Sequence, residues 1–259
     1  TSSTKLFPGL YKIYHNYRPE NAIMARGIRG IYFQSYAVKM ENAVIVFLKY
    51  PEPGKVKTRL ARDIGDEKAC AVYKSLAENV IKNIFTKDTG TYTVHIFFTP
   101  ADKETEIKDW LKPFIQGNRG VKTQFSPQEG RNLGERMSNA FEQIFRGKGC
   151  KRGIIIGTDC PEIDATLIEN AFDILKEKNV VIGPCKDGGY YLIGMSRPTP
   201  DLFVDIDWST DRVFEQTMEK IQKNNLSCCI LKTLADIDTI EDLYRYSPKL
   251  NKPESKNEN

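Results

Sequence analysis

Apolar and polar positions divide this chain into two kinds of segment that follow each other in turn. Residues Ala43 to Leu48 are apolar without alternation, which is typical of a strand covered on both faces of a parallel sheet. Residues Glu67 to Phe85 place apolar side chains at helical spacing, and Thr91 to Phe98 return to a strand pattern. This strand–helix–strand order predicts a βαβ unit.

The same order continues along the chain and predicts an α/β protein. Helices are expected at 104–111, 132–145, 166–176, 213–222 and after 239. Further strands are expected at 121–125, 153–157, 180–183 and 228–231, and the aromatic segment Tyr190 to Met195 lies between the last two.

The length of 259 residues and the 40% hydrophobic content indicate one large domain rather than two small ones. We expect it to cover residues 40–247, since Met40 directly precedes the first core strand. Residues 1–39 lack the continuous apolar stretch of a signal peptide, and we interpret them as an extension outside the fold. A role of this segment at a membrane surface or a partner is the alternative. The polar residues 248–259 are expected to be a disordered tail.

The charge distribution argues against a nucleic-acid partner. The net charge is +4, but residues 1–40 hold six Lys or Arg against one Glu, which leaves 32 Lys or Arg and 33 Asp or Glu in the rest. The expected domain therefore has no general basic surface. No apolar run approaches the roughly 20 residues that cross a bilayer, so no membrane span is expected.

The six cysteines form no CxxC pair, and the chain has only two histidines, His15 and His95. This composition favours a cytoplasmic protein and gives little support to zinc sites or histidine-based catalysis. Any bound metal is expected to have oxygen ligands.

The loop after the first strand carries a cluster of cations on a Pro/Gly background. Its expected phosphate-binding residues are Lys49, Pro53, Gly54, Lys55, Lys57 and Arg59. Parallel sheets bind ligands at the carboxyl ends of their strands, which is where this loop lies. Thr58 is expected to cap a helix that begins at Arg59, whose free amide groups would add positive charge. A solvated basic turn is the alternative. Neither a P-loop nor a GxGxxG fingerprint is present.

Carboxylates follow two later strand-like segments. Asp159 follows three isoleucines, and Asp238 lies in the acidic segment LADIDTIEDL. We expect Asp159 and Asp238 to share one Mg²⁺ or Mn²⁺ ion with substrate phosphates, and we assign both a catalytic role. Helix capping is the alternative for Asp159, and Thr239 with Asp242 resembles a capping box.

The segment GPCKDGGYYLIG lies between these carboxylates. Gly188 and Gly189 permit close approach to a ligand, although glycine pairs also make ordinary turns. Asp187 is the expected base that activates the acceptor, with Asp207 as the alternative. Cys160 and Cys185 flank the expected site, but buried cysteines are mostly packing groups.

Six blocks, FLKYPEPGKVKTRL, NLGERM, IIIGTDCPEI, GPCKDGGYYLIG, DWST and DIDTIEDL, resemble in order and spacing the radical-SAM/selenodomain-associated transferase family, which is glycosyltransferase-like and linked by name to arsenosugar biosynthesis. The resemblance covers about residues 42–245. It implies the nucleotide-diphospho-sugar transferase fold, a GT-A-like, mostly parallel mixed sheet with helices on both faces.

By this resemblance the three loop cations meet nucleotide phosphates, and Asp159 takes the place of the metal-binding aspartate of a DxD element. Gly157 stands where a strict DxD has its first aspartate, which leaves one aspartate at this strand. Asp238 matches the carboxylate of a DTPED-type segment, whose proline is replaced by Ile240.

The expected function is glycosyl transfer from a nucleotide sugar to a small acceptor, with Mg²⁺ or Mn²⁺ as cofactor. The first alternative is a nucleotidyltransferase that releases pyrophosphate from a nucleoside triphosphate, and the second is a non-catalytic nucleotide-binding protein. Arg136, with Arg131 and Glu135, is expected to contact the base or the acceptor. A charged helix start explains these three residues equally well.

Overall fold

The computed structural model describes residues 22–27, 30–35, 41–85, 91–116, 122–147 and 149–246. The chain forms two units, Thr1–Lys39 and Met40–Asn259. In the first unit, strands β1 (Ala22–Gly27) and β2 (Gly30–Ser35) pair antiparallel, with Ala22 opposite Ser35. The sequence pattern did not predict this pair. The expected disordered tail, 248–259, and the rest of the leader lie outside the described residues.

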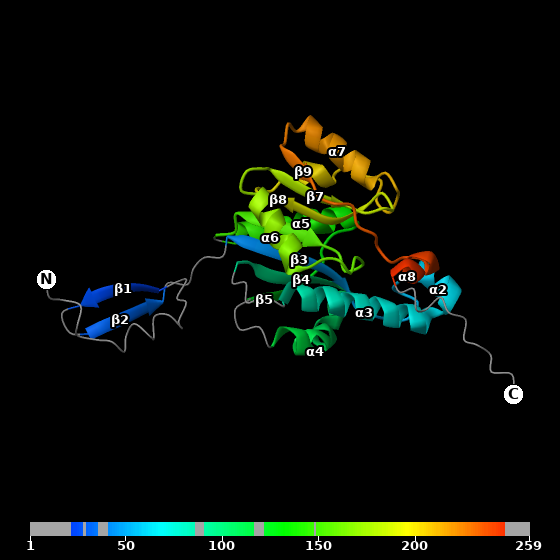
Figure 1. The fold of residues 1–259 in the computed structure, drawn as a ribbon, viewed down its shortest axis with the longest axis horizontal. Helices are drawn as coiled ribbons and strands as arrows, with labels where there is room; N and C mark the ends of the chain where they lie inside the picture. The colour runs from blue at the N-terminus through cyan, green and yellow to red at the C-terminus, as the bar shows by residue number, and fades with distance from the viewer. Residues whose placement is uncertain are drawn as a thin grey trace. The chain divides into compact units, whose positions relative to one another are not determined.

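The second unit is built on a seven-stranded sheet in the order β5-β4-β3-β6-β8-β7-β9 (Figure 1). The strands are β3 (Asn42–Lys49), β4 (Thr93–Thr99), β5 (Thr123–Pro127), β6 (Arg152–Ile156), β7 (Val180–Pro184), β8 (Tyr190–Met195) and β9 (Cys228–Ile230). Only β8 runs antiparallel to its neighbours among these strands, and every other neighbouring pair is parallel. The predicted mixed, mostly parallel α/β sheet is therefore confirmed.

Helices cover both faces of this sheet. The described helices of this unit are α2 (Thr58–Ile64), α3 (Asp66–Phe85), α4 (Glu104–Ile115), α5 (Leu133–Arg146), α6 (Ala165–Ile174), α7 (Val213–Lys223) and α8 (Ile240–Tyr246), with short 3₁₀ turns η1 (Ala101–Lys103) and η2 (Pro200–Phe203). Side chains of α3, α4 and α6 pack in one core cluster, whereas those of α5, η2 and α7 pack in another. Among the described residues, no helix is long and apolar enough to cross a membrane.

The non-alternating pattern of β3 has its cause in this double cover. Val44 and Val46 pack with α3 on one face of the sheet, while Ala43 and Ile45 pack with α5 on the other. All four are at most 2% exposed. Burial of a Val or Ile side chain stabilises the fold by about 1.5–3 kcal/mol, so a polar residue at Val44, Ile45 or Val46 would be destabilising.

The start of α2 differs from the expectation. The helix begins at Thr58 rather than Arg59, and the preceding residue is Lys57, with φ 49° and ψ 44°, whose side chain makes no capping hydrogen bond. The prediction that Thr58 caps this helix was wrong, because the chain turns into the helix through a left-handed lysine that is fixed by ion pairs instead.

The topology brings four loops to one edge of the sheet. Strands β3, β6, β7 and β9 run in the same direction, since β6 and β7 are both antiparallel to β8. The loops that follow them, 50–57, 157–164, 185–189 and 231–239, therefore emerge at the same carboxyl edge, which is where open α/β sheets bind ligands.

Candidate active site

The loop after β3 is a fixed turn. The amide of Lys55 donates to the carbonyl of Glu52 at 3.0 Å, with Pro53 and Gly54 between them and Gly54 at φ 76°. Proline at the second position and a positive φ at the third are the requirements of a type II turn. The side chain of Val56 packs against Cys70 and Tyr73 of α3, and this contact anchors the loop to the helix. The turn holds the side chain of Lys55 in solvent.

Lys57 is the central cation of the site. Its Nζ lies 2.6 Å from Oδ1 of Asp159 and 2.9 Å from Oδ1 of Asp238, and its side chain is only 3% exposed. Burial works against the charged form of the lysine, but the two aspartates outweigh it and hold the pKa of Lys57 above its usual value. The site therefore keeps a permanent, buried positive charge.

The two aspartates come from loops that are tied to each other. Asp159 stands three residues after the end of β6, and its carbonyl accepts a 3.2 Å hydrogen bond from the amide of Ile237. This bond aligns the 157–164 loop with the segment that carries Asp238. The structure thus brings the two predicted metal ligands together, with the ammonium of Lys57 between their facing oxygens.

Asp238 is positioned by the helix that follows it. Thr239 and Asp242 form the predicted capping box: the amide of Asp242 donates to Thr239 Oγ1 at 3.3 Å, and the amide of Thr239 donates to Asp242 Oδ2 at 3.0 Å. The amide of Asp238 donates to the same Oδ2 at 3.4 Å. The capping role of these residues is confirmed, and it leaves the carboxylate of Asp238 free to face Lys57.

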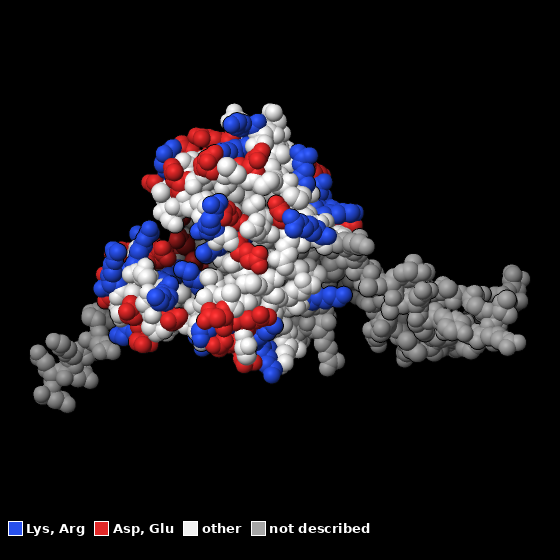
Figure 2. Space-filling view, turned by 180° about the vertical axis from the view of Figure 1, so that it is seen from behind, with Lys and Arg blue, Asp and Glu red and all other residues white. Residues whose placement is uncertain are grey.

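Two further cations, Lys55 and Arg59, lie on the same loop and at the start of α2. Arg59 lies 3.6 Å from Oδ2 of Asp238 while 60% of its side chain stays exposed, and Lys55 is exposed on the turn. Figure 2 shows a recess with acidic side chains inside it and Lys and Arg side chains around it, on the side of the unit where Figure 1 shows α2 and α8. Two partly open pockets of about 460 and 530 Å³ are lined by residues outside this group.

The last residue of β3, Lys49, is held through its backbone. Its amide donates to the Tyr73 hydroxyl at 2.8 Å, and this hydroxyl donates to the Lys49 carbonyl at 3.1 Å. Tyr73 therefore fixes the point at which the strand passes into the cation-bearing loop. No sequence motif marks this contact, because it depends on the packing of α3 against the strand.

The backbone of the turn between β7 and β8 adopts a geometry that requires glycine at one position. Gly188 has φ 88°, and a Cβ atom there would lie 2.0 Å from the carbonyl oxygen of Asp211. This close approach of the backbone requires glycine whether or not a ligand is bound. Asp187 is exposed, and its Oδ1 accepts a 2.9 Å hydrogen bond from the amide of Gly189.

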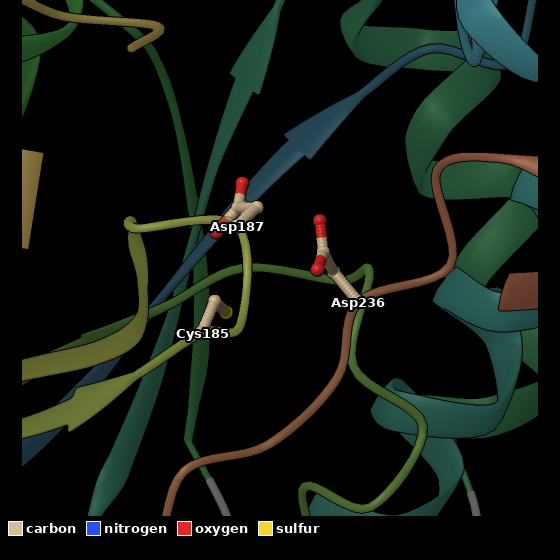
Figure 3. Close-up of side chains that lie close together, drawn as sticks. All are labelled: Cys185, Asp187 and Asp236. Atoms are coloured by element: carbon tan, nitrogen blue, oxygen red, sulfur yellow. The ribbon is translucent and has the colours of Figure 1, made fainter. Parts of the chain in front are cut away.

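Three side chains with metal-binding atoms meet beside this turn. The ligand atoms of Cys185, Asp187 and Asp236 all lie within 4.8 Å of one another (Figure 3). Burial, then the carboxylate of Asp187 and more weakly that of Asp238, raises the pKa of Asp236 to about 6. The sequence analysis did not select Asp236, although the spacing of Asp236 and Asp238 by two places both carboxylates on one side of an extended segment.

The other predicted residues lie apart from Lys57. Arg136 Nε donates to the carbonyl of Gly130, and Arg131 pairs with Glu135 at the start of α5. The described residues show no ion pair or hydrogen bond from these side chains to Asp159 or Asp238. The carboxylate of Asp207, the alternative base, accepts from Gln216 Nε2 at 2.7 Å and is thereby engaged with α7.

Comparison with known proteins identifies a matching family and proteins of similar sequence and fold. Residues 84–210 match a family described as "Uncharacterized protein conserved in bacteria (DUF2064)". A candidate nucleotide-diphospho-sugar transferase from Desulfovibrio desulfuricans is 34% identical, with a TM-score of 0.71 over 82% of this chain and 88% of its own. A 2-phospho-L-lactate guanylyltransferase from Methanocaldococcus jannaschii is 27% identical over 191 residues, 73% of this chain and 75% of its own.

A more distant structure agrees on the fold. The 4-diphosphocytidyl-2C-methyl-D-erythritol synthase from Anaerococcus prevotii has a TM-score of 0.53 at 10% identity, over 82% of this chain and 98% of its own. Sheet order, carboxyl-edge site and relatives together define a transferase-like protein with the nucleotide-diphospho-sugar transferase fold, as predicted. The chain belongs to the same family as the D. desulfuricans protein, and its residues 84–210 carry the DUF2064 match.

Proposed function

We propose that this chain is a metal-assisted transferase that binds the phosphates of a nucleotide-activated donor at the 50–57 loop and passes the glycosyl group to a small acceptor. The observation that supports the proposal most is the convergence of Lys57, Asp159 and Asp238 beside a rigid, cation-bearing turn. Fixed charges of this kind stabilise a developing charge without reorganisation.

Lys55 and Arg59 are the proposed phosphate contacts. Both are exposed, both follow the central strand, and Arg59 is held near the recess by its 3.6 Å contact with Asp238. Arginine suits bidentate phosphate binding, and lysine adds a point charge. Lys57 is buried and lies deeper between the carboxylates, where its charge limits their mutual repulsion.

The residues present also fit a divalent cation. Lys57 contacts Oδ1 of both aspartates, which leaves Oδ2 of Asp159 and Oδ2 of Asp238 as proposed ligands, and 45% and 34% of these side chains are exposed. Mg²⁺ favours one or two protein carboxylates together with substrate phosphates. When bound there, Mg²⁺ or Mn²⁺ would neutralise charge on the leaving diphosphate.

Asp187 is the proposed base that takes a proton from the acceptor. It is exposed at the carboxyl edge, and the hydrogen bond from Gly189 to its Oδ1 orients the carboxylate. The alternative base, Asp207, is less suited to this role because its carboxylate already accepts from Gln216. Gly189 and Arg136 stay proposed substrate contacts.

Nucleotidyl transfer is the second proposed reaction, and the guanylyltransferase from M. jannaschii favours it. The same loop would bind a nucleoside triphosphate, with a phosphorylated acceptor as the nucleophile. The fold and the relatives support the two reactions equally. The links of the resembled family to radical-SAM proteins and arsenosugars also stay proposals.

Product analysis separates these reactions. The chain is incubated with Mg²⁺ and either nucleoside triphosphates and phosphorylated acceptors or nucleotide sugars and small alcohols. Release of nucleoside diphosphate from a nucleotide sugar supports glycosyl transfer, whereas release of pyrophosphate supports nucleotidyl transfer. Nucleotide binding without turnover of either donor class would contradict both and leave a nucleotide-binding protein.

A further inference from the structure

We propose that Cys160 and Cys185 form a reversible modification site, at which a peroxide oxidises the two thiols to a disulfide beside the proposed active site. Their sulfur atoms lie 3.6 Å apart, and either thiol can donate to the other. Cys160 lies in the loop after β6, and Cys185 directly follows the last residue of β7. The inference goes beyond the proposed function, because the disulfide forms without nucleotide, metal or acceptor.

This pair differs from the other cysteines of the chain. The thiols of Cys150, Cys228 and Cys229 each donate to a backbone carbonyl, and Cys70 is buried in a separate apolar cluster. Among the described residues, no other two thiols are hydrogen-bonded to each other. Most buried cysteines are small packing groups. Packing alone requires a small apolar side chain at each position, however, and not two sulfur atoms in contact.

The backbone keeps the two cysteines next to each other. Cys185 pairs with Leu234 in a parallel bridge. The carbonyl of Asp159, the residue before Cys160, accepts a 3.2 Å hydrogen bond from the amide of Ile237. Both cysteines are thus tied to the segment that leads into α8. A disulfide, with its sulfur atoms about 2.0 Å apart, therefore needs mainly a movement of the two side chains.

Exposure assigns each thiol a step in the reaction. Cys185 is partly exposed, so a small peroxide can reach its sulfur, whereas Cys160 is only 2% exposed. The sulfur of Cys185 attacks hydrogen peroxide, the O–O bond breaks, and a sulfenic acid and one water form. The sulfur of Cys160 then attacks the Cys185 sulfur. The S–S bond forms, the S–O bond breaks, and the leaving hydroxide takes the thiol proton as a second water.

The electron count of these two steps is balanced. The two thiols lose two electrons and two protons, and one hydrogen peroxide is reduced to two waters. A dithiol reductant reverses the modification by thiol–disulfide exchange. In a reducing compartment such a bond is transient rather than structural.

The disulfide would disturb the contact between Lys57 and Asp159. Cys160 directly follows Asp159, whose Oδ1 lies 2.6 Å from the Lys57 ammonium. Movement of Cys160 toward Cys185 therefore displaces a residue to which we assign metal binding. We expect the oxidised protein to bind the donor nucleotide about tenfold more weakly or worse, since misplacement by 1 Å can cost this much. This consequence rests on the proposed function, whereas the disulfide itself does not.

Peptide mapping tests the modification. The full chain, freed of reductant and nucleotide, is treated with hydrogen peroxide, and the remaining thiols are alkylated after unfolding. Cleavage after Lys and Arg places Cys160 in peptide 153–176 and Cys185 in peptide 179–186. We expect these two peptides to be linked, with two hydrogen atoms fewer than their summed mass. Dithiothreitol should release them.

Variants separate the two steps. Cys185→Ser should abolish the link and leave Cys160 reduced, whereas Cys160→Ser should leave Cys185 as a sulfenic acid that dimedone labels. Cys229→Ser, on strand β9, is the matched control and should keep the link. A wild type without the link, or with a link between two molecules only, would overturn the proposal. Dimedone labelling of Cys160 rather than Cys185 in the single variants would overturn it too.

Nucleotide binding to the reduced and oxidised proteins tests the consequence. Equal affinity of the two forms would overturn the effect on the site, although the peptide link would still establish the modification. A reduced protein that binds no nucleotide would contradict the proposed function and not the disulfide. The two failures are therefore distinguishable.

Discussion

The ammonium of Lys57 lies 2.9 Å from a carboxylate oxygen of Asp238, a residue 181 positions further along the chain. The same ammonium contacts Asp159, so one buried lysine joins the loop after β3 to the loops after β6 and β9. This contact fixes the relative positions of the residues to which we assign phosphate and metal binding. Its disruption should therefore affect stability and ligand binding together.

The ion pairs of Lys57 should show strong coupling in a mutant cycle. Asp159→Asn or Asp238→Asn alone leaves the ammonium one carboxylate partner, and we expect each to cost about 1 kcal/mol or less, because both aspartates are partly exposed. The double variant leaves a buried, unpaired charge and should cost about 3–5 kcal/mol. Urea unfolding of the four proteins measures the coupling. If the two single effects add within error, the buried charge of Lys57 is not stabilised jointly by Asp159 and Asp238.

Catalysis should depend on Asp159 far more than folding does. We expect Asp159→Ala to lower the transfer rate by about 10²-fold or more, as for loss of a major electrostatic stabiliser, with the fold intact. The control is Asp173→Ala, which removes an exposed aspartate that pairs with Lys176. Initial rates with the donor identified by product analysis measure the effect. A loss under threefold, or unchanged metal-dependent nucleotide binding, would remove Asp159 from the mechanism.

Loss of the capping box of α8 should lower stability and weaken donor binding at the site. Asp242→Ala removes the acceptor of the Thr239 and Asp238 amides, and we expect a loss of about 1 kcal/mol in stability together with a higher KM for the donor. Asp164→Ala, which removes the cap of α6, is a matched control with a similar stability cost and an unchanged KM. Thermal unfolding and steady-state kinetics provide the two readouts. Equal KM effects in both variants would contradict a specific role for α8.

Asp236 should make the metal-free protein less stable as the pH rises. Its folded pKa of about 6 exceeds its ordinary value of 3.8, so the folded state binds more protons than the unfolded state in this window. The contribution to stability is therefore present at low pH and is lost as the pH rises from about 4 to about 6. We expect Asp236→Asn to gain stability over wild type at pH 8, on the order of 1 kcal/mol after solvent screening. A variant less stable than wild type at pH 8 would contradict this explanation.

The sequence predicted the sheet because its strands are buried on both faces, and burial leaves a pattern that periodicity detects. It also predicted that Asp159 and Asp238 would meet, since both follow strands of a parallel sheet. The lysine between them was not foreseen, because Lys55, Lys57 and Arg59 look alike in sequence and differ only in burial. The spacing of Cys185 and Asp236 likewise gives no sign that their side chains come within 4.8 Å of each other, a proximity that follows from the parallel bridge between Cys185 and Leu234.

The most direct test of the central claim is thermal unfolding with a panel of nucleotide sugars and nucleoside triphosphates, with and without Mg²⁺ or Mn²⁺. The account predicts that at least one nucleotide, together with the metal, raises Tm. At a nucleotide concentration of 100 times its Kd, the free energy of unfolding should rise by about 2.7 kcal/mol. The shift should be strongly reduced in Lys55→Ala and Arg59→Ala and retained in Arg62→Ala, whose side chain lies in the last turn of α2. No stabilisation by any nucleotide, or equal stabilisation of all four proteins, would contradict phosphate binding at this edge of the sheet.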